Sequence, residues 1–150
     1  MLIREEPATE ATVATRILAR AGLLPAEGRV TVRAGEVVYV SAHGVSNHTM
    51  TPYDTAIVRI ADGEILFGMP PADLERYLAV YRAHPDAGSV IARADGTLEH
   101  GTTLRRCALR LLAEPGGGGG ESAGDDRWRA LVADARVAGT LIGAFPLGEE

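Results

Sequence analysis

The sequence predicts a single domain of the α/β class. Its 150 residues, 46% of them hydrophobic and 23% charged, suit one globular domain with a core of its own. Along the chain the hydrophobic spacing changes between the helical and the strand period, in the order helix, four strands, helix, strand. The four consecutive strands form two hairpins, so we expect antiparallel pairing in the sheet.

One helix and the two hairpins occupy the first half of the chain. Thr9 can cap a first helix that runs to about Ala21, and Gly22 is the expected stop. Alternating and β-branched residues then predict two pairs of strands. The second pair turns at Asp62-Gly63, which is the commonest short hairpin signal. The expected pairs are strands 28–33 with 37–41, and strands 55–60 with 64–67.

The second half begins with a helix and a buried strand. We expect the helix over 70–83, because a proline suits its first turn. Residues 89–92 indicate a buried strand, and Thr102 or Thr103 can cap a further helix. Beyond it we expect a flexible glycine-rich linker over 116–124, a helix over 127–138 and a last strand over 140–147.

Composition excludes several classes of function. All 15 basic residues are arginine, so no side chain can form a Schiff base with a carbonyl substrate or with pyridoxal phosphate. The net charge of −5 argues against nucleic acid as a partner. No apolar run approaches the roughly 20 residues that span a bilayer, and no signal peptide is recognisable, so we expect a cytoplasmic protein without membrane contact. The lone Cys107 agrees with a reducing compartment, and we expect it to be buried.

Five segments, in this order and spacing, carry a family resemblance. They are GRVTVR from Gly28, VSAHGVS from Val40, MTPYD from Met50, ILFG from Ile65 and AVYRAHPDAGSVI from Ala79. Together they resemble the N-terminal part of the class II aldolase/adducin family, over about residues 12–95. The resemblance implies a class II aldolase/adducin-like α/β fold with a central, mainly antiparallel sheet flanked by helices. It also implies one domain over 1–150 with a truncated C-terminal part.

The resemblance implies a chemistry that depends on a metal. Active members of the family hold an enediolate on a divalent metal, and they cleave carbon-carbon bonds, epimerise sugar phosphates or dehydrate them. Two of their metal-binding histidines would stand at residues 92 and 94, on the same side of one strand. Ala92 and Ala94 stand there instead, and no histidine follows His100, so we expect neither metal nor another cofactor. A replacement metal site would have to use other residues, namely His43, His48, Asp95, Glu99 and His100.

The acid/base carboxylate of the family belongs to a Ser-Ser-Glu sequence. By spacing from Tyr81, that tripeptide aligns with Pro71-Ala72-Asp73 in this chain. Asp73 therefore keeps a carboxylate, whereas the two phosphate-binding hydroxyls are missing. An aspartate near a helix N-terminus also favours the helix dipole, so a purely structural role remains open. Glu75 is the alternative catalyst if the alignment is displaced by two residues.

The turns that contact phosphate in the family are also altered. Arg29 stands where the family has asparagine, and Ser41 to Gly44 stand in place of a Thr-x-x-Gly turn. We predict that Arg29, Ser41 and the backbone amide of Gly44 bind substrate. His43 would be a second proton carrier, and an exposed loop histidine without a chemical role is the alternative. Arg93 could place a fixed positive charge where the metal would be, to stabilise an enolate or bind a carboxylate.

Two classes of function follow from these residues. The first is a metal-independent lyase, isomerase, dehydratase or cyclase that acts on a carbonyl-containing small molecule in specialised biosynthesis, with Asp73 as acid/base. The second is a non-catalytic pseudo-aldolase that serves as a binding or assembly subunit, because the adducin branch implies that the fold persists without aldolase chemistry. Family members are commonly homo-oligomers, so the resemblance implies a homo-oligomer or a pathway-enzyme partner.

Overall fold

The computed structural model describes residues 5–113 as three α-helices, six strands and one short 3-10 turn. In this part of the chain, every helix is too short or too polar to pass through a bilayer. The linker over 116–124 and the two elements expected after it lie outside the described residues. In chain order the elements are α1 (Glu5–Arg20), β1 (Val30–Ala34), β2 (Val37–Ser41), η1 (Pro52–Asp54), β3 (Thr55–Arg59), β4 (Ile65–Phe67), α2 (Leu74–Ala83), β5 (Ser89–Ala92), β6 (Leu98–Gly101) and α3 (Leu104–Ala113).

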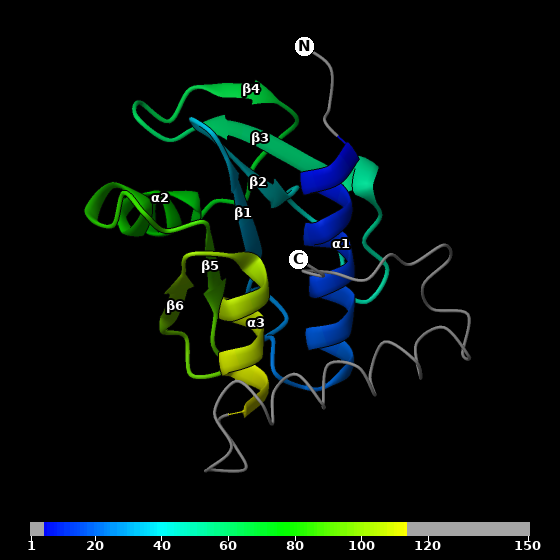
Figure 1. The fold of residues 1–150 in the computed structure, drawn as a ribbon. Coiled ribbons are helices and arrows are strands. Elements are labelled where there is room, and N and C mark those ends of the chain that lie inside the picture. Colours follow the sequence, from blue (N-terminus) through cyan, green and yellow to red (C-terminus); the bar gives the residue numbers. More distant parts are fainter. Residues whose placement is uncertain (1–4, 114–150) are drawn as a thin grey trace.

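The six strands form one antiparallel sheet in the order β4-β3-β2-β1-β5-β6. Both expected hairpins are present, since β1 pairs with β2 and β3 pairs with β4. β5 joins the sheet beside β1, and β6 extends it beyond β5 (Figure 1). The expected α/β fold, with a central antiparallel sheet flanked by helices, is therefore confirmed.

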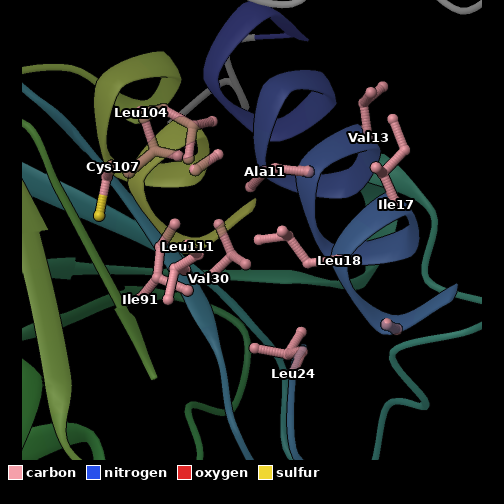
Figure 2. Close-up of a cluster of buried hydrophobic side chains, with 14 of the residues drawn as sticks. Ala11, Val13, Ile17, Leu18, Leu24, Val30, Ile91, Leu104, Cys107 and Leu111 are labelled. Carbon is pink, nitrogen blue, oxygen red and sulfur yellow. The ribbon is translucent and has the colours of Figure 1, made fainter. Parts of the chain in front are cut away.

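The helices cover the two faces of this sheet. α1 and α3 pack on one face, where their apolar side chains meet Val30 of β1 and Ile91 of β5 (Figure 2). α2 covers the other face and buries Tyr77 among aliphatic residues of β2, β3 and β5. Because successive strand residues point to opposite faces, Val90 and Ala92 lie on the α2 face while Ile91 lies on the α1 face. The side chain at residue 92 therefore points to the same side as α2.

The first helix begins earlier than expected and ends as expected. α1 starts at Glu5, so Thr9 lies inside the helix and is not its cap. Pro7 sits in the first turn, where the missing N–H leaves no helical hydrogen bond unmade. At the other end Gly22 adopts φ +74°, and the N–H groups of Gly22 and Leu23 donate to carbonyls of the last turn. A glycine is favoured there because other residues resist this left-handed conformation.

Two later boundaries also differ from the expectation. α2 begins at Leu74 rather than at Pro70, because Pro71 disfavours helical backbone at the residue before it. β6 is absent from the predicted elements, although its turn contains Asp95-Gly96, with Gly96 at φ +89°. The same dipeptide marks the β3–β4 turn, so the sequence carries a signal for β6. The cap of α3 is as expected, since Thr103 Oγ1 accepts a backbone N–H of the first turn at 3.1 Å.

Cys107 lies on the buried side of α3. Its Sγ donates a hydrogen bond to the backbone oxygen of Glu99 on β6 at 3.4 Å. Burial raises the pKa of the Cys107 thiol to about 12, since a charged thiolate is disfavoured away from water. The thiol is therefore neutral at physiological pH, and its expected burial is confirmed.

Candidate functional site

Loops at one end of the sheet enclose a pocket of about 730 Å³. They meet because β1 begins where its two antiparallel neighbours, β2 and β5, end. The loop into α2 and the first turn of that helix complete the wall. Four of the predicted site residues line this pocket: Arg29, His43, Gly44 and Asp73.

Arg29 is held in the pocket wall through both its backbone and its side chain. Its N–H donates to the phenolic oxygen of Tyr77 at 3.0 Å, and its carbonyl accepts the N–H of Ala92 at 3.1 Å. The side chain is only 8% exposed. Nη1 donates to Ser41 Oγ at 2.9 Å and to the oxygen of Val45 at 3.5 Å, whereas the buried Nε has no acceptor. The pocket therefore contains a fixed positive charge with unused hydrogen-bonding capacity.

Asp73 occupies the N-cap position of α2. Its carboxylate makes no capping hydrogen bond, so the helix does not use the side chain as a cap acceptor. The favourable interaction of the charge with the helix dipole persists. The carboxylate lies near Tyr77, whose pKa is raised first by burial and in smaller part by the charge of Asp73. At the N-terminal end of α2, the Asp73 carboxylate therefore has no hydrogen-bond partner among the described residues.

His43 and Gly44 belong to the loop that follows β2. The N–H of His43 donates to the oxygen of Met69 at 2.8 Å, which ties this loop to the segment leading into α2. The imidazole is exposed and lines the pocket. Gly44 has φ +82°, and no atom lies within 4 Å of a Cβ built there, so the turn needs glycine for its backbone conformation alone.

Asn47 holds the loop before β1 in place, and sequence reasoning did not identify it. Its side chain is buried, and Nδ2 lies within hydrogen-bond distance of three carbonyls, those of Pro25 at 3.1 Å, Ala26 at 3.3 Å and Gly28 at 3.0 Å. Gly28 fits tightly, because an added Cβ would stand 2.6 Å from a ring carbon of Pro25. A single asparagine in a polar loop gives no sequence signal for such a role.

Two residues of α2 also reach the pocket without having been predicted as site residues. Tyr77 shows helical apolar spacing, and only the structure reveals that its hydroxyl accepts the Arg29 N–H. Arg76 is exposed, donates to the oxygen of Gly96 at 2.8 Å and lies 5.5 Å from the centre of the Tyr77 ring. Arg76 therefore contributes to the pocket wall beside Tyr77.

Three other candidates lie away from the pocket lining. Arg93 pairs with Glu99 of β6, so its guanidinium is directed along the β5–β6 hairpin and not into the pocket. Ser41 is fully buried and contacts the pocket only through its hydrogen bond with Arg29. Glu75, the alternative acid/base group, pairs with an arginine of the last turn of α2 and lies outside the pocket lining.

The described residues do not fit the divalent metal that the family fold implies. Ala92 lines the pocket, and a methyl group offers no ligand atom. Ala94, past the end of β5, likewise has none. Within residues 5–113, no three histidine, cysteine or acidic side chains come together as a metal site. The proposed replacement set is not assembled either, since His100 stacks on His84 with ring centroids 4.0 Å apart.

The fold and the pocket define an α/β protein with a pocket at the end of an antiparallel sheet. Residues 9–91 match the family model described as the class II aldolase and adducin N-terminal domain. The chain therefore belongs to the class II aldolase and adducin family, as the resemblance implied. Among curated proteins, none matches this sequence.

Solved structures of the family share the fold. L-fuculose 1-phosphate aldolase from Glaciozyma antarctica PI12 superposes with a TM-score of 0.64 at 16% identity, over 91% of each chain. An aldolase II superfamily protein from Pseudomonas syringae gives 0.66 at 14% identity, over 93% of this chain and 96% of that one. YgbL from Escherichia coli, a putative aldolase/epimerase/decarboxylase, gives 0.52 at 22% identity, over 71% of this chain and 49% of its own. At these identities the likeness establishes the fold.

Proposed function

We propose that the chain is a metal-independent acid/base enzyme of the lyase or isomerase type, which acts on a carbonyl-containing small molecule in the cytoplasm. The observation that supports it most is that Asp73, His43 and the buried guanidinium of Arg29 line one pocket. Family membership supports a lyase-type scaffold. Cleavage, epimerisation and decarboxylation beside a carbonyl share an anionic intermediate, so one pocket that stabilises negative charge serves all of them.

The roles of the residues follow from their chemistry. Asp73 takes the proton from the carbon beside the carbonyl, the electron pair of that C–H bond forms the C=C bond of an enolate, and the C=O π pair moves to the oxygen. The resulting enolate carries the negative charge that the cation of Arg29 stabilises. His43 delivers a proton to a different atom, which completes an isomerisation, or to a departing hydroxyl, which completes a dehydration. Each step balances without an oxidant or a second substrate.

Isotope exchange tests this proposal without knowledge of the natural substrate. Protein treated with a chelator is incubated in D₂O with a panel of small ketones, hydroxyketones and 2-oxo acids, and deuterium uptake beside the carbonyl is followed by NMR. We expect exchange that survives chelation and that falls by about 100-fold in Asp73→Asn, in the range of general acid/base effects. Elemental analysis of the purified protein accompanies the assay. Exchange that needs added metal, or that is unchanged in Asp73→Asn, would refute the proposal.

A second candidate is the binding or assembly subunit, and one observation favours it. Large apolar side chains are exposed on and near the edge strand β4: Tyr53 at 82%, Ile65 at 55%, Phe67 at 40% and Met69 at 68%. Ile65 and Phe67 point to the same side of β4, as alternate strand residues do. Exposed apolar edges commonly mark association surfaces. Light scattering that shows an oligomer dissociated by Phe67→Asp, together with no exchange in the assay above, would support this candidate.

A further inference from the structure

Among the described residues, the buried side chain of Arg29 has no counterion. Its residue is 8% exposed, and in this part of the chain no carboxylate forms an ion pair with it. Asp73 and Glu27 line the same pocket but do not bond the guanidinium. A buried charge without a partner is costly. Because this charge borders a pocket, a ligand can supply the missing negative group.

The hydrogen bonds of the Arg29 guanidinium leave some of its N–H donors unused. Nη1 is used by Ser41 Oγ and by the oxygen of Val45. Nε is buried and has no acceptor, and no hydrogen bond is formed by Nη2 to a described residue. Because Arg29 also lines the pocket, its unused donors can bind the oxygens of a carboxylate through charge-assisted hydrogen bonds.

The other groups in the pocket favour a single negative charge over two. Asp73 and Glu27 would repel a phosphate dianion, and Arg76 is exposed and already donates to the oxygen of Gly96. Pro71 and Ala72 line the wall with side chains that carry no donor. One buried guanidinium therefore balances the single charge of a carboxylate, whereas a phosphate dianion would keep part of its charge unbalanced beside Asp73 and Glu27.

The position of Arg29 is fixed before any ligand arrives. Tyr77 and Ala92 hold its backbone, and Asn47 ties the preceding loop through its amide. Gly28 packs closely against β5, since a Cβ added there would stand only 3.0 Å from the Cβ of Ala92. Such preorganisation reduces the entropy lost when a ligand binds.

From this geometry we propose that the substrate is a carbonyl-containing carboxylic acid, such as a 2-oxo acid, whose carboxylate binds the guanidinium of Arg29. The inference rests on the proposed function, since it names the anionic group of the substrate that the same pocket takes. It assigns recognition to Arg29 and leaves proton transfer to Asp73 and His43.

Binding is tested by NMR titration of the ¹⁵N-labelled full chain at constant ionic strength. The probes are pyruvate, its uncharged counterpart hydroxyacetone, and inorganic phosphate. We expect pyruvate to shift the Arg29 Nε–H signal saturably, and we expect the other two to leave it unchanged. Arg29→Lys keeps the charge but loses the paired donors, so its pyruvate affinity falls by about tenfold or more. Arg59→Lys, an exposed arginine on β3 paired with Asp62 and Glu64, is the matched control and binds as the wild type does.

Each outcome of the titration decides the inference. A stronger response to phosphate than to pyruvate, or no response to pyruvate, overturns the inference. Both results come from the wild-type protein, so they hold even if Arg29→Lys does not fold. Asp73→Asn keeps pyruvate binding while it loses isotope exchange. Pyruvate binding in a wild-type protein that shows no exchange refutes the proposed function and leaves the carboxylate site. Exchange on hydroxyacetone that is indifferent to Arg29→Lys refutes the carboxylate site and leaves the function.

Discussion

The backbone N–H of Arg29 donates a hydrogen bond to the phenolic oxygen of Tyr77 at 3.0 Å, although 48 positions separate the two residues in the sequence. The bond joins the residue before β1 to the first turns of α2. It therefore fixes the Arg29 cation, at one end of the sheet, relative to the helix that begins beside Asp73. Both atoms are buried. The relative placement of the two proposed functional groups therefore depends on a tyrosine whose spacing alone suggests only core packing.

Replacing Tyr77 by phenylalanine should destabilise the protein. The ring is retained, but the buried N–H of Arg29 loses its acceptor, which costs about 1–3 kcal/mol. Urea denaturation of Tyr77→Phe measures the loss. Tyr53→Phe, at a position 82% exposed, is the control and should stay within about 0.5 kcal/mol of the wild type. Equal stabilities of the two variants would contradict the importance of this bond.

Asn47→Ala should loosen the loop before β1. The change removes the amide that lies between the carbonyls of Pro25, Ala26 and Gly28, in a loop closed by the Gly28 N–H bond to the Pro25 oxygen at 2.9 Å. We expect faster amide hydrogen exchange at Gly28 and a stability loss of about 1–3 kcal/mol. Ser46→Ala, at an exposed neighbour, should change neither quantity. Unaltered amide hydrogen exchange at Gly28 would show that Asn47 does not hold the loop before β1 in place.

Glu99→Gln should cost more stability than Glu75→Gln. Glu99 is only 13% exposed and pairs with both Arg93 and Arg110, so its replacement weakens two charge-assisted bonds in a partly buried setting. We expect a loss of about 1–2 kcal/mol. Glu75 is 72% exposed and pairs with one arginine, for which about 0–0.5 kcal/mol is typical. Thermal and urea unfolding of both variants checks the order, and the reverse order would disprove it.

Stability should fall at high pH because of Cys107. Burial raises the pKa of its thiol from 9.0 to about 12 in the folded chain, so the folded state holds this proton more tightly than the unfolded state does. The resulting stabilisation is complete below pH 9 and is lost as pH rises through about 12.

Between pH 9 and pH 11 the contribution of Cys107 should decline by up to about 1.4 kcal/mol per pH unit. Denaturation curves of the wild type and Cys107→Ala at several pH values measure the difference. The raised pKa values of Tyr77 and Tyr81 act in the same direction in both proteins, and only the smaller part of the Tyr81 shift that comes from Cys107 differs between them. Parallel pH profiles would contradict this account of Cys107.

Local spacing accounts for most of the elements. The ranges expected for β2 and β5 agree with the structure residue for residue, and the buried face of α2 carries the apolar residues that its helical spacing marks. α1 and α2 begin at other residues than expected. Pro7 lies in the first turn of α1, and Pro71 disfavours helical backbone at the residue before it, so α2 begins later. β6 was missed although Asp95-Gly96 signals its turn, because residues Leu98–Gly101 lack strand-like composition and are stabilised as a strand by pairing with β5.

The sequence by itself determined the fold class, the family and the residue types at the candidate site, because these depend on local spacing and on the order of short segments. Tertiary structure decided which of the candidate side chains share a pocket. It brought Arg29, His43 and Asp73 to one pocket, turned Arg93 to Glu99, and gave Tyr77 and Asn47 roles in holding Arg29. The physical reason is that burial, charge pairing and hydrogen bonding between distant segments arise only when the sheet and α2 are packed together.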